Sequence, residues 1–148
     1  MSQVKPVPDG YHCVQPYLIF KNAAAAIAFC VQAFGATEKF RMPGPEGRIG
    51  HAEILIGDST IMLADEAPQM DAYSPEHYGG SPISLLIYTA DCDAVYAQAL
   101  AAGAESLREP ADQPYGDRMS GVRDPFGYKW YIATHIKDVS HEEMGAQG

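Results

Sequence analysis

Two similar segments constrain the fold of this chain more than any other feature. AFGATE at residues 33–38 and AAGAES at residues 101–106 both combine small residues, a glycine and an acidic residue. Each segment closes an alanine-rich helical stretch that follows an apolar strand, and each leads into a strand and a hairpin. We therefore interpret the chain as two βαβββ modules, an α+β architecture. A single unrepeated α+β sheet is the alternative.

Helix signals support this interpretation in both halves. Asn22 is placed as an N-cap, and Gly35 as a C-terminal stop, for a helix whose apolar residues recur every three to four positions. Asp91 or Asp93 caps the second helix, which Gly103 is expected to stop. The predicted strands lie at 12–20, 37–42, 49–56, 60–65, 83–90 and 104–109, followed by a hairpin that ends at residue 135.

The segment 66–82 separates the modules. It holds three prolines and two glycines and has no hydrophobic period, which is typical of a loop. The predicted organisation is an N-terminal arm (1–11), a first module (12–65), a linker (66–82), a second module (83–135) and a C-terminal tail (136–148).

Charge and cysteine content argue against several functions. The 148 residues carry a net charge of −9, which disfavours nucleic acid as a partner because phosphate contacts need Lys and Arg. No apolar run approaches the roughly 20 residues of a membrane span, and no signal peptide is recognised at the start. The three cysteines form no C-x-x-C pair, which favours reduced thiols in the cytoplasm.

The last strand, YKWYIATH, is unusually aromatic and follows the turn sequence Asp-Pro-Phe-Gly. A strand has a side-chain period of two, so its residues divide between two faces. We expect Trp130 and Ile132 to face the helices. The opposite, site-facing set consists of Lys129, Tyr131, Ala133 and His135.

Three stretches carry a resemblance to a known family: AIAFCVQAFGATE, AVYAQALAAGAE and YGDRMSGVRDPFGYKWYI. Over residues 12–135 the chain resembles the vicinal oxygen chelate superfamily, which includes glyoxalase I, bleomycin resistance proteins and extradiol dioxygenases. The resemblance implies a glyoxalase-like fold in which two modules form a shared concave sheet with helices outside. It also implies a homodimer, in which modules can be exchanged between chains.

Metal enzymes of this superfamily carry one ligand on each of four strands. Matched through neighbouring motif residues, those positions are Gln15, Met62, Ser84 and Tyr131 in this chain. Only Gln15 keeps the character of a ligand, because a thioether, a hydroxyl and a neutral phenol bind divalent cations poorly. The resemblance therefore implies the fold without the usual metal, and no cofactor is expected.

The residues expected on the concave face combine aromatic and apolar groups with a few polar ones, the composition of a small-molecule pocket. The alternative is that they fill the interior. We predict a small-molecule binder similar to the bleomycin resistance branch, and the acidity of the chain would suit a cationic ligand. Whether it catalyses a reaction is left open. The predicted pocket residues are Gln15, Tyr17, Met62, Ser84, Tyr88, Tyr131 and His135.

His51 and Glu53 alternate in GHAEILIG and so share one strand face. One hypothesis makes them half of a relocated Zn or Ni site, completed by Gln15 and His135, in a lyase or isomerase resembling glyoxalase I. The other hypothesis treats them as a polar pair on a partly solvent-exposed surface. The partners expected in either case are a small molecule and a second copy of the chain.

Overall fold

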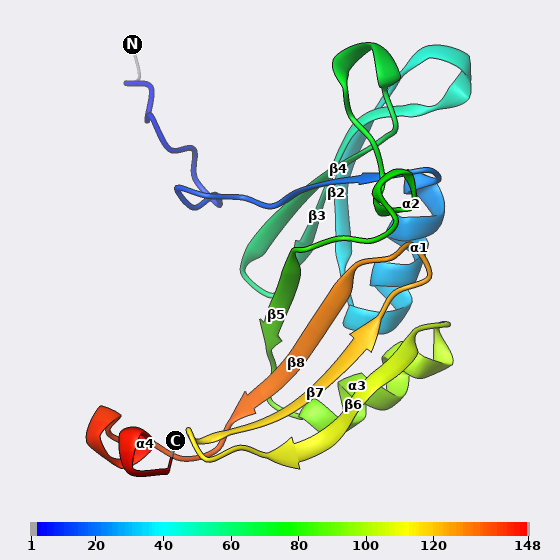
Figure 1. The fold of residues 1–148 in the computed structure, drawn as a ribbon. Coiled ribbons are helices and arrows are strands. Elements are labelled where there is room, and N and C mark those ends of the chain that lie inside the picture. Colours follow the sequence, from blue (N-terminus) through cyan, green and yellow to red (C-terminus); the bar gives the residue numbers. More distant parts are fainter. Residues whose placement is uncertain (1–2, 148) are drawn as a thin grey trace. The chain divides into compact units, whose positions relative to one another are not determined.

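The computed structural model describes residues 3–147, which divide into two compact units, with the division in the chain between Tyr78 and Gly79 (Figure 1). The first unit contains β1 (Tyr17–Phe20), α1 (Ala23–Phe34), β2 (Thr37–Pro43), β3 (Ile49–Ile56), β4 (Ser59–Asp65) and α2 (Pro75–Tyr78). The second contains β5 (Ser84–Tyr88), α3 (Cys92–Ala101), β6 (Glu105–Asp112), β7 (Asp117–Arg123), β8 (Lys129–His135) and α4 (His141–Gln147). Each unit has the predicted βαβββ order, so the α+β fold class is confirmed.

The two sheets have the same topology. The strand order is β1-β4-β3-β2 in the first sheet and β5-β8-β7-β6 in the second. In each sheet the first and last strands of the module pair in parallel, and the other neighbours are antiparallel. An identical mixed order in both units supports the interpretation of the chain as a repeat. That the two sheets share one concave face stays a prediction.

Helix α1 covers one face of the first sheet. The Asn22 side chain accepts a hydrogen bond from the amide of Ala25 at 3.1 Å, and Gly35 ends the helix in the left-handed conformation. Both caps are those that the sequence predicts. The buried side of α1 includes Ile27 and Cys30, and the helix packs against β1, β3 and β4. The strand residues that share this core include Leu18, Phe20, Ile54 and Leu63.

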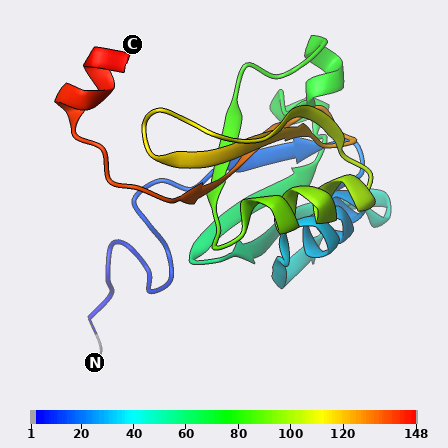
Figure 2. The ribbon, with the colours of Figure 1, turned by 90° about the horizontal axis from the view of Figure 1, so that it is seen from below.

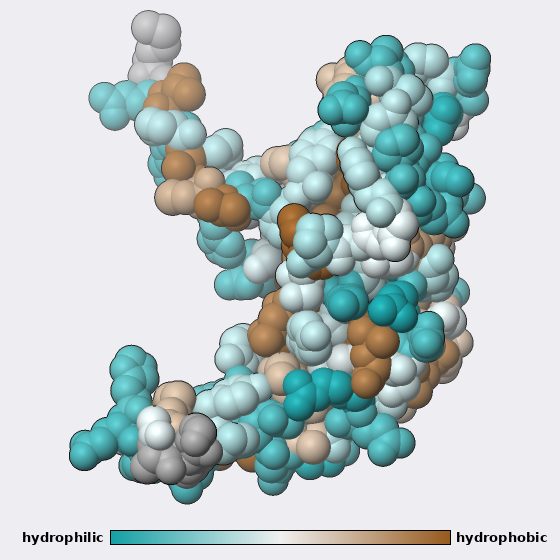
Figure 3. All heavy atoms as spheres, viewed as in Figure 1, coloured by the Kyte–Doolittle hydropathy of each residue, from teal (hydrophilic) through white to brown (hydrophobic). Residues whose placement is uncertain are grey.

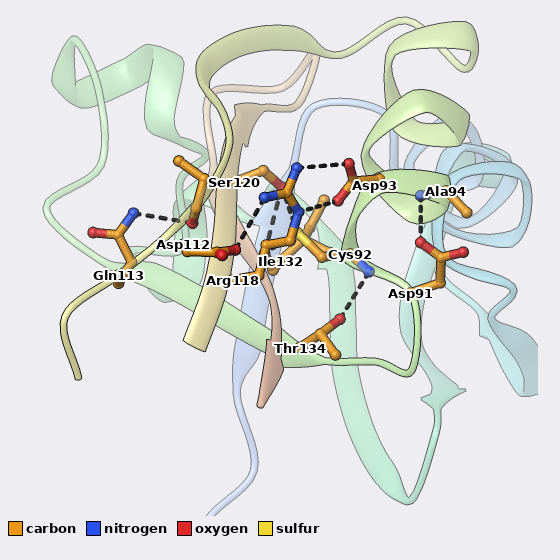
Figure 4. Close-up of polar contacts among 11 residues, drawn as sticks. Asp91, Cys92, Asp93, Ala94, Asp112, Gln113, Arg118, Ser120, Ile132 and Thr134 are labelled. Atoms are coloured by element: carbon orange, nitrogen blue, oxygen red, sulfur yellow. Dashed lines mark hydrogen bonds and ion pairs between the residues drawn. The ribbon is translucent and has the colours of Figure 1, made fainter. Parts of the chain in front are cut away.

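Helix α3 lies along one face of the second sheet in both ribbon views (Figure 1 and Figure 2). Asp91, rather than Asp93, caps the helix by accepting from the amide of Ala94. The amide of Cys92 donates to Thr134 Oγ1 at 2.8 Å and so ties the helix start to β8 (Figure 4). Arg118 Nε lies 2.6 Å from a carboxylate oxygen of Asp93. Helix α3 does not cover the opposite face of the second sheet.

The turn before β8 sets the register of that strand. The Asp124 carboxylate accepts hydrogen bonds from the amides of Phe126 and Tyr128, and from Trp130 Nε1 at 2.9 Å. Trp130 is 1% exposed and lies in the core with Ile132. The alternation along β8 therefore places Tyr131 on the opposite face, and the predicted register is confirmed.

The predicted start of the first strand is wrong. The first strand begins at Tyr17 instead of residue 12, because Gln15 accepts from the His12 amide and donates to the His12 carbonyl, which closes a turn. Pro16, which has no N–H, directly precedes the strand. Helix α3 ends at Ala101, and Gly103, with a φ of +115°, directly follows the C-cap residue Ala102 and stops the helix as predicted.

The predicted linker has local structure of its own. It contains a 3-10 turn at Pro68–Met70 and the four-residue α2, but an isolated bridge between Ala67 and Ala72 is its only strand pairing within the described residues. The Glu66 carboxylate holds the segment by accepting from the amide and the hydroxyl of Ser74. At the other end of the chain, Ser140 caps α4, which extends beyond β8 in both ribbon views. None of the helices described is both long and apolar enough to span a membrane.

Candidate functional site

The candidate site lies on the face of the first sheet opposite α1. Alternation along the strands sends Leu18, Ile54 and Leu63 towards the helix. The opposite face carries a row of paired residues, because Tyr17 is in register with Met62 on β4, and Met62 with Glu53 on β3. Residues from three strands are thereby brought together on an open surface.

Glu53 is the most buried charged group of this face, with an exposed fraction of 5%. Its Oε2 lies 2.8 Å from His51 Nε2, and its Oε1 accepts from the Tyr11 hydroxyl. Lys39 Nζ lies 3.9 Å from Oε1. Burial by itself would raise the pKa of Glu53, but the hydrogen bonds from His51 and Tyr11 outweigh it, so the pKa is lowered. The carboxylate is therefore ionised at neutral pH.

His51 links Glu53 to Tyr17. The Tyr17 phenolic oxygen lies 2.7 Å from His51 Nδ1. An ionised carboxylate can only accept hydrogen bonds, so His51 donates to Glu53 through Nε2, and in this tautomer Nδ1 is the acceptor. Tyr17 consequently donates its hydroxyl proton inwards. We call these three residues the Tyr17–His51–Glu53 chain.

Tyr17 keeps its proton at neutral pH. Burial, together with the negative charge of Glu53, raises the pKa of the Tyr17 phenol. The side chain of Tyr17 is nevertheless 48% exposed. The Tyr17–His51–Glu53 chain therefore runs from a buried anion to a neutral phenol at the surface.

Two hollows lie beside this chain in the first unit. The larger, which we call the loop hollow, has a volume of about 660 Å³ and is lined by Tyr17, Ile19, Ile49 and Ala64 with parts of the loops 44–48 and 65–72. The smaller, the arm hollow, measures about 510 Å³ and is lined by the N-terminal arm with Gln15, Glu53 and Met62. Tyr17 thus borders one hollow, and Glu53 the other.

The N-terminal arm brings hydrophobic residues to the arm hollow. Val7 and the neighbouring prolines line it, together with Tyr11, His12 and Cys13. The space-filling view shows hydrophobic surface along this arm (Figure 3), where Val4 and Val7 are exposed. The arm, predicted only as a segment outside the two modules, therefore contributes to the walls of the candidate site.

A similar network occupies the open face of the second sheet. Asp117 is nearly fully buried and accepts from the Tyr88 hydroxyl at 2.8 Å. His135 Nδ1 lies 2.8 Å from Asp117, and its Nε2 lies 2.7 Å from Asp138. The hydrogen bonds to Asp138 and Asp117 raise the pKa of His135. Each unit therefore contains a buried carboxylate bound by a histidine and a tyrosine.

The structure distributes the predicted site residues over both units. Gln15, Tyr17 and Met62 lie in the first unit, and the Gln15 amide is held by its own turn. The Tyr131 ring lies over Gly121, where an added Cβ would come within 3.1 Å of it. That all these residues share one pocket stays a prediction. The members in the second unit are Ser84, Tyr88, Tyr131 and His135.

Sequence reasoning missed three residues of these networks. Tyr11 belongs to the arm, and Lys39 reaches Glu53 from a register shift in β2 between Glu38 and Phe40 that no sequence pattern indicates. Asp117 stands in the quoted Tyr-Gly-Asp-Arg stretch, beside Arg118. Its pairing with His135 across the β7–β8 hairpin was the signal that could have identified it.

The arrangement of donor atoms determines whether the protein can hold a metal ion. Among residues 3–147, no group of three or more His, Cys, Asp or Glu side chains is arranged to hold a metal ion. His51 and Glu53 supply two donors that already bind each other. Both ring nitrogens of His135 bind aspartates.

Comparison with known proteins agrees with the observed fold. The model of the Glyoxalase/Bleomycin resistance protein/Dioxygenase superfamily matches residues 11–132. The chain belongs to this superfamily. An uncharacterized protein of Mycobacterium bovis is 39% identical over 136 residues, covering 90% of each chain. An uncharacterized protein of Arabidopsis thaliana is 27% identical over 127 residues, covering 79% of this chain and 76% of its own.

Solved structures with the same fold include one from Micromonospora and one from Nocardioides. TioX from Micromonospora sp. ML1 superposes with a TM-score of 0.65 at 23% identity, covering 87% of this chain and all of its own. A glyoxalase/bleomycin resistance protein/dioxygenase from Nocardioides gives a TM-score of 0.66 at 19% identity, covering 95% and 90%. At this level of identity the likeness concerns the fold.

Proposed function

We propose that this superfamily member binds a small organic molecule on the open face of its first sheet. The observation that carries the proposal is the Tyr17–His51–Glu53 chain, an ionised buried carboxylate connected to a half-exposed phenol between two hollows. A few placed polar groups within mostly apolar walls are the usual construction of a small-molecule site.

We infer that the ligand is bound without the superfamily's usual metal. The four positions expected to carry ligands hold Gln15, Met62, Ser84 and Tyr131. Both polar atoms of the Gln15 amide bind the His12 backbone. A thioether, a hydroxyl and a phenol are weaker ligands than the carboxylates and imidazoles that divalent cations prefer. The residues at these positions do not fit a Zn or Ni ion.

A metal-dependent lyase or isomerase is the second candidate. The observation in its favour is the contact of 2.8 Å between His51 and Glu53, which are two donors of the hypothesised set. The other two members, Gln15 and His135, already direct their polar atoms to the protein. Metal binding there would require these hydrogen bonds to break, so we favour metal-free binding.

We also propose that the chain forms a homodimer in the cytoplasm. Several large apolar side chains are exposed and would be covered by a second copy. Three free cysteines and no disulfide in the described chain suit a reducing compartment. Light scattering over a wide concentration range tests the dimer, and a strict monomer would contradict it. The exposed apolar residues include Val14, Phe40, Met42, Ile83 and Leu86.

The binding proposal is tested by screening small organic molecules against isotope-labelled protein by amide NMR. We expect ligands that shift the amides of Tyr17, Glu53 and Met62, with affinities unchanged by a chelator. Ile19→Trp, which places a large ring in the loop hollow, should weaken this binding. Val31→Trp on the exposed side of α1 is the matched control and should not.

Two results of that screen would contradict the proposal. If no molecule shifts the amides of this face, the face is not a small-molecule site. If shifts develop only after Zn or Ni is added, the metal-dependent alternative is correct. Metal content of protein purified without chelator provides an independent measurement.

A further inference from the structure

The direction of one hydrogen bond determines what Tyr17 can offer a ligand in the loop hollow. The Tyr17 proton is donated to His51 Nδ1, since Nε2 of that ring already donates to Glu53. The Tyr17 oxygen retains a free lone pair on a side chain that borders the hollow. Tyr17 therefore presents a hydrogen-bond acceptor, polarised by the anion behind it.

The charged residues around the loop hollow are mostly negative, like the partial charge on the Tyr17 oxygen. Glu46, Asp65 and Glu66 line it, against the single cation Arg48. Hydrogen bonds from Ser74 lower the pKa of Glu66, which stays ionised. The Asp65 carboxylate accepts hydrogen bonds from the amides of Ala23 and Ile49, each at 2.7 Å. Three carboxylates and one guanidinium leave the hollow net negative.

The remainder of the lining is apolar. Ile19, Ile49 and Ala64 form its strand side, and Pro68 and Met70 its loop side. A volume of about 660 Å³ lies within the range of small-molecule sites, which is roughly 300–1,000 Å³. A ligand that fills this space must combine an apolar body with one polar end.

We propose that the ligand of the loop hollow is an organic ammonium ion with an apolar body, whose N–H donates to the Tyr17 oxygen. This inference rests on the proposed function and specifies its ligand class. The ammonium charge is stabilised by the carboxylates of the two loops and by Glu53 behind Tyr17. The apolar body packs on Ile19, Ile49 and Ala64.

An anionic ligand is the main competitor, because no hydrogen bond or ion pair joins the Arg48 guanidinium to the described residues, and only the Arg48 backbone is hydrogen-bonded. A carboxylate ligand would meet the like charges of Glu46 and Glu66, and Tyr17 would have no proton to donate to it. The geometry therefore favours the cation over the anion.

The test compares three probes of similar shape and different charge: 2-phenylethylamine, 2-phenylethanol and 3-phenylpropionate. Amide NMR titrations are run at about pH 7.5, where an aliphatic amine with a pKa near 10 is charged. We expect the amine to shift the amides of Ile19, Ile49 and Ala64 at lower concentration than the alcohol, and the carboxylate to shift them least.

Tyr17→Phe isolates the proposed hydrogen bond. It should weaken amine binding by roughly two- to tenfold, the worth of one hydrogen bond, and leave alcohol binding less affected. Tyr96→Phe is the matched control, since it removes a tyrosine hydroxyl that bonds Ser106 in the second unit. The amide spectrum of each variant reports whether it is folded.

The outcomes separate the inference from the proposed function. Tighter binding of the carboxylate, lost in Arg48→Gln, would overturn the ammonium assignment and leave small-molecule binding intact. Equal binding of all three probes would also overturn the ammonium assignment and leave small-molecule binding intact. Absence of any shift at these amides would refute both the ligand class and the use of the loop hollow as a binding site.

Discussion

The phenolic oxygen of Tyr17 on β1 lies 2.7 Å from Nδ1 of His51 on β3, and the other nitrogen of the same ring lies 2.8 Å from Glu53. These three residues form a hydrogen-bond chain that ends at a buried anion, Glu53. The anion sets the tautomer of the histidine, and the histidine sets the direction in which the phenol donates. Loss of the anion should therefore change the surface that a ligand meets.

Replacement of Glu53 tests how much the anion contributes to stability. Glu53→Gln should lower the free energy of unfolding at neutral pH by about 1–3 kcal/mol, because His51 and Tyr11 lose a charged acceptor. Because the pKa of Glu53 is lowered in the folded state, its stabilising effect is present above the unfolded pKa of about 4.3. That effect is lost as the pH falls through the folded-state value.

The difference between wild type and Glu53→Gln should consequently narrow in acid, as measured by urea denaturation at a series of pH values. Glu109→Gln, at an exposed site, is the control and should behave as wild type. A difference that is constant across the acid range would show that the folded-state pKa of Glu53 is not lowered.

The second network predicts the titration of a histidine. Asp138, followed by Asp117, raises the pKa of His135 above its usual value. Asp138→Asn should lower that pKa, as observed by NMR titration of the imidazole. Glu142→Gln, another acidic residue of the same tail, should leave it unchanged. A His135 pKa unaffected by Asp138→Asn would contradict the contact of 2.7 Å.

The raised pKa of His135 also determines how the stability of the fold changes with pH. A histidine whose folded-state pKa is raised stabilises the fold below the unfolded value of about 6.5, and this contribution is lost as the pH rises through the folded-state value. His135→Gln should remove that pH dependence. Since His135 is half exposed, we expect a small change that solvent screens.

The contact between Tyr131 and Gly121 predicts non-additive effects. Gly121→Ala would place a methyl group about 3.1 Å from the Tyr131 ring and should cost about 1–3 kcal/mol of stability. In a Tyr131→Ala background the same change should cost much less, because the ring is gone. Chemical denaturation of the four proteins measures the coupling. Additive costs would mean that the ring does not lie over Gly121.

The fold was largely predictable because its signals are local. Asn22, Gly35 and the Asp-Pro-Phe-Gly turn act on the backbone within a few residues of themselves, and they set the helix ends and the register of β8. The first strand was predicted too long because Gln15 bonds the backbone of His12, a side-chain preference that competes with strand pairing.

The site was less predictable because it depends on contacts between distant residues. The pairing of His51 with Glu53 follows from strand alternation, but their links to Tyr11 and Tyr17 join residues more than thirty positions apart. Lys39 reaches Glu53 only because of a register shift in β2. Contacts of this kind leave no periodic pattern in the sequence.

The most direct test of this account is the tautomer of His51, measured by long-range proton–nitrogen NMR of the imidazole at neutral pH. We predict a proton on Nε2 and none on Nδ1 in the wild-type protein. In Glu53→Gln the preference for this tautomer should weaken, because an amide can donate as well as accept. A proton on Nδ1 of neutral His51 in the wild type would contradict the account. Tyr17 would then accept from His51 and point its own proton outwards.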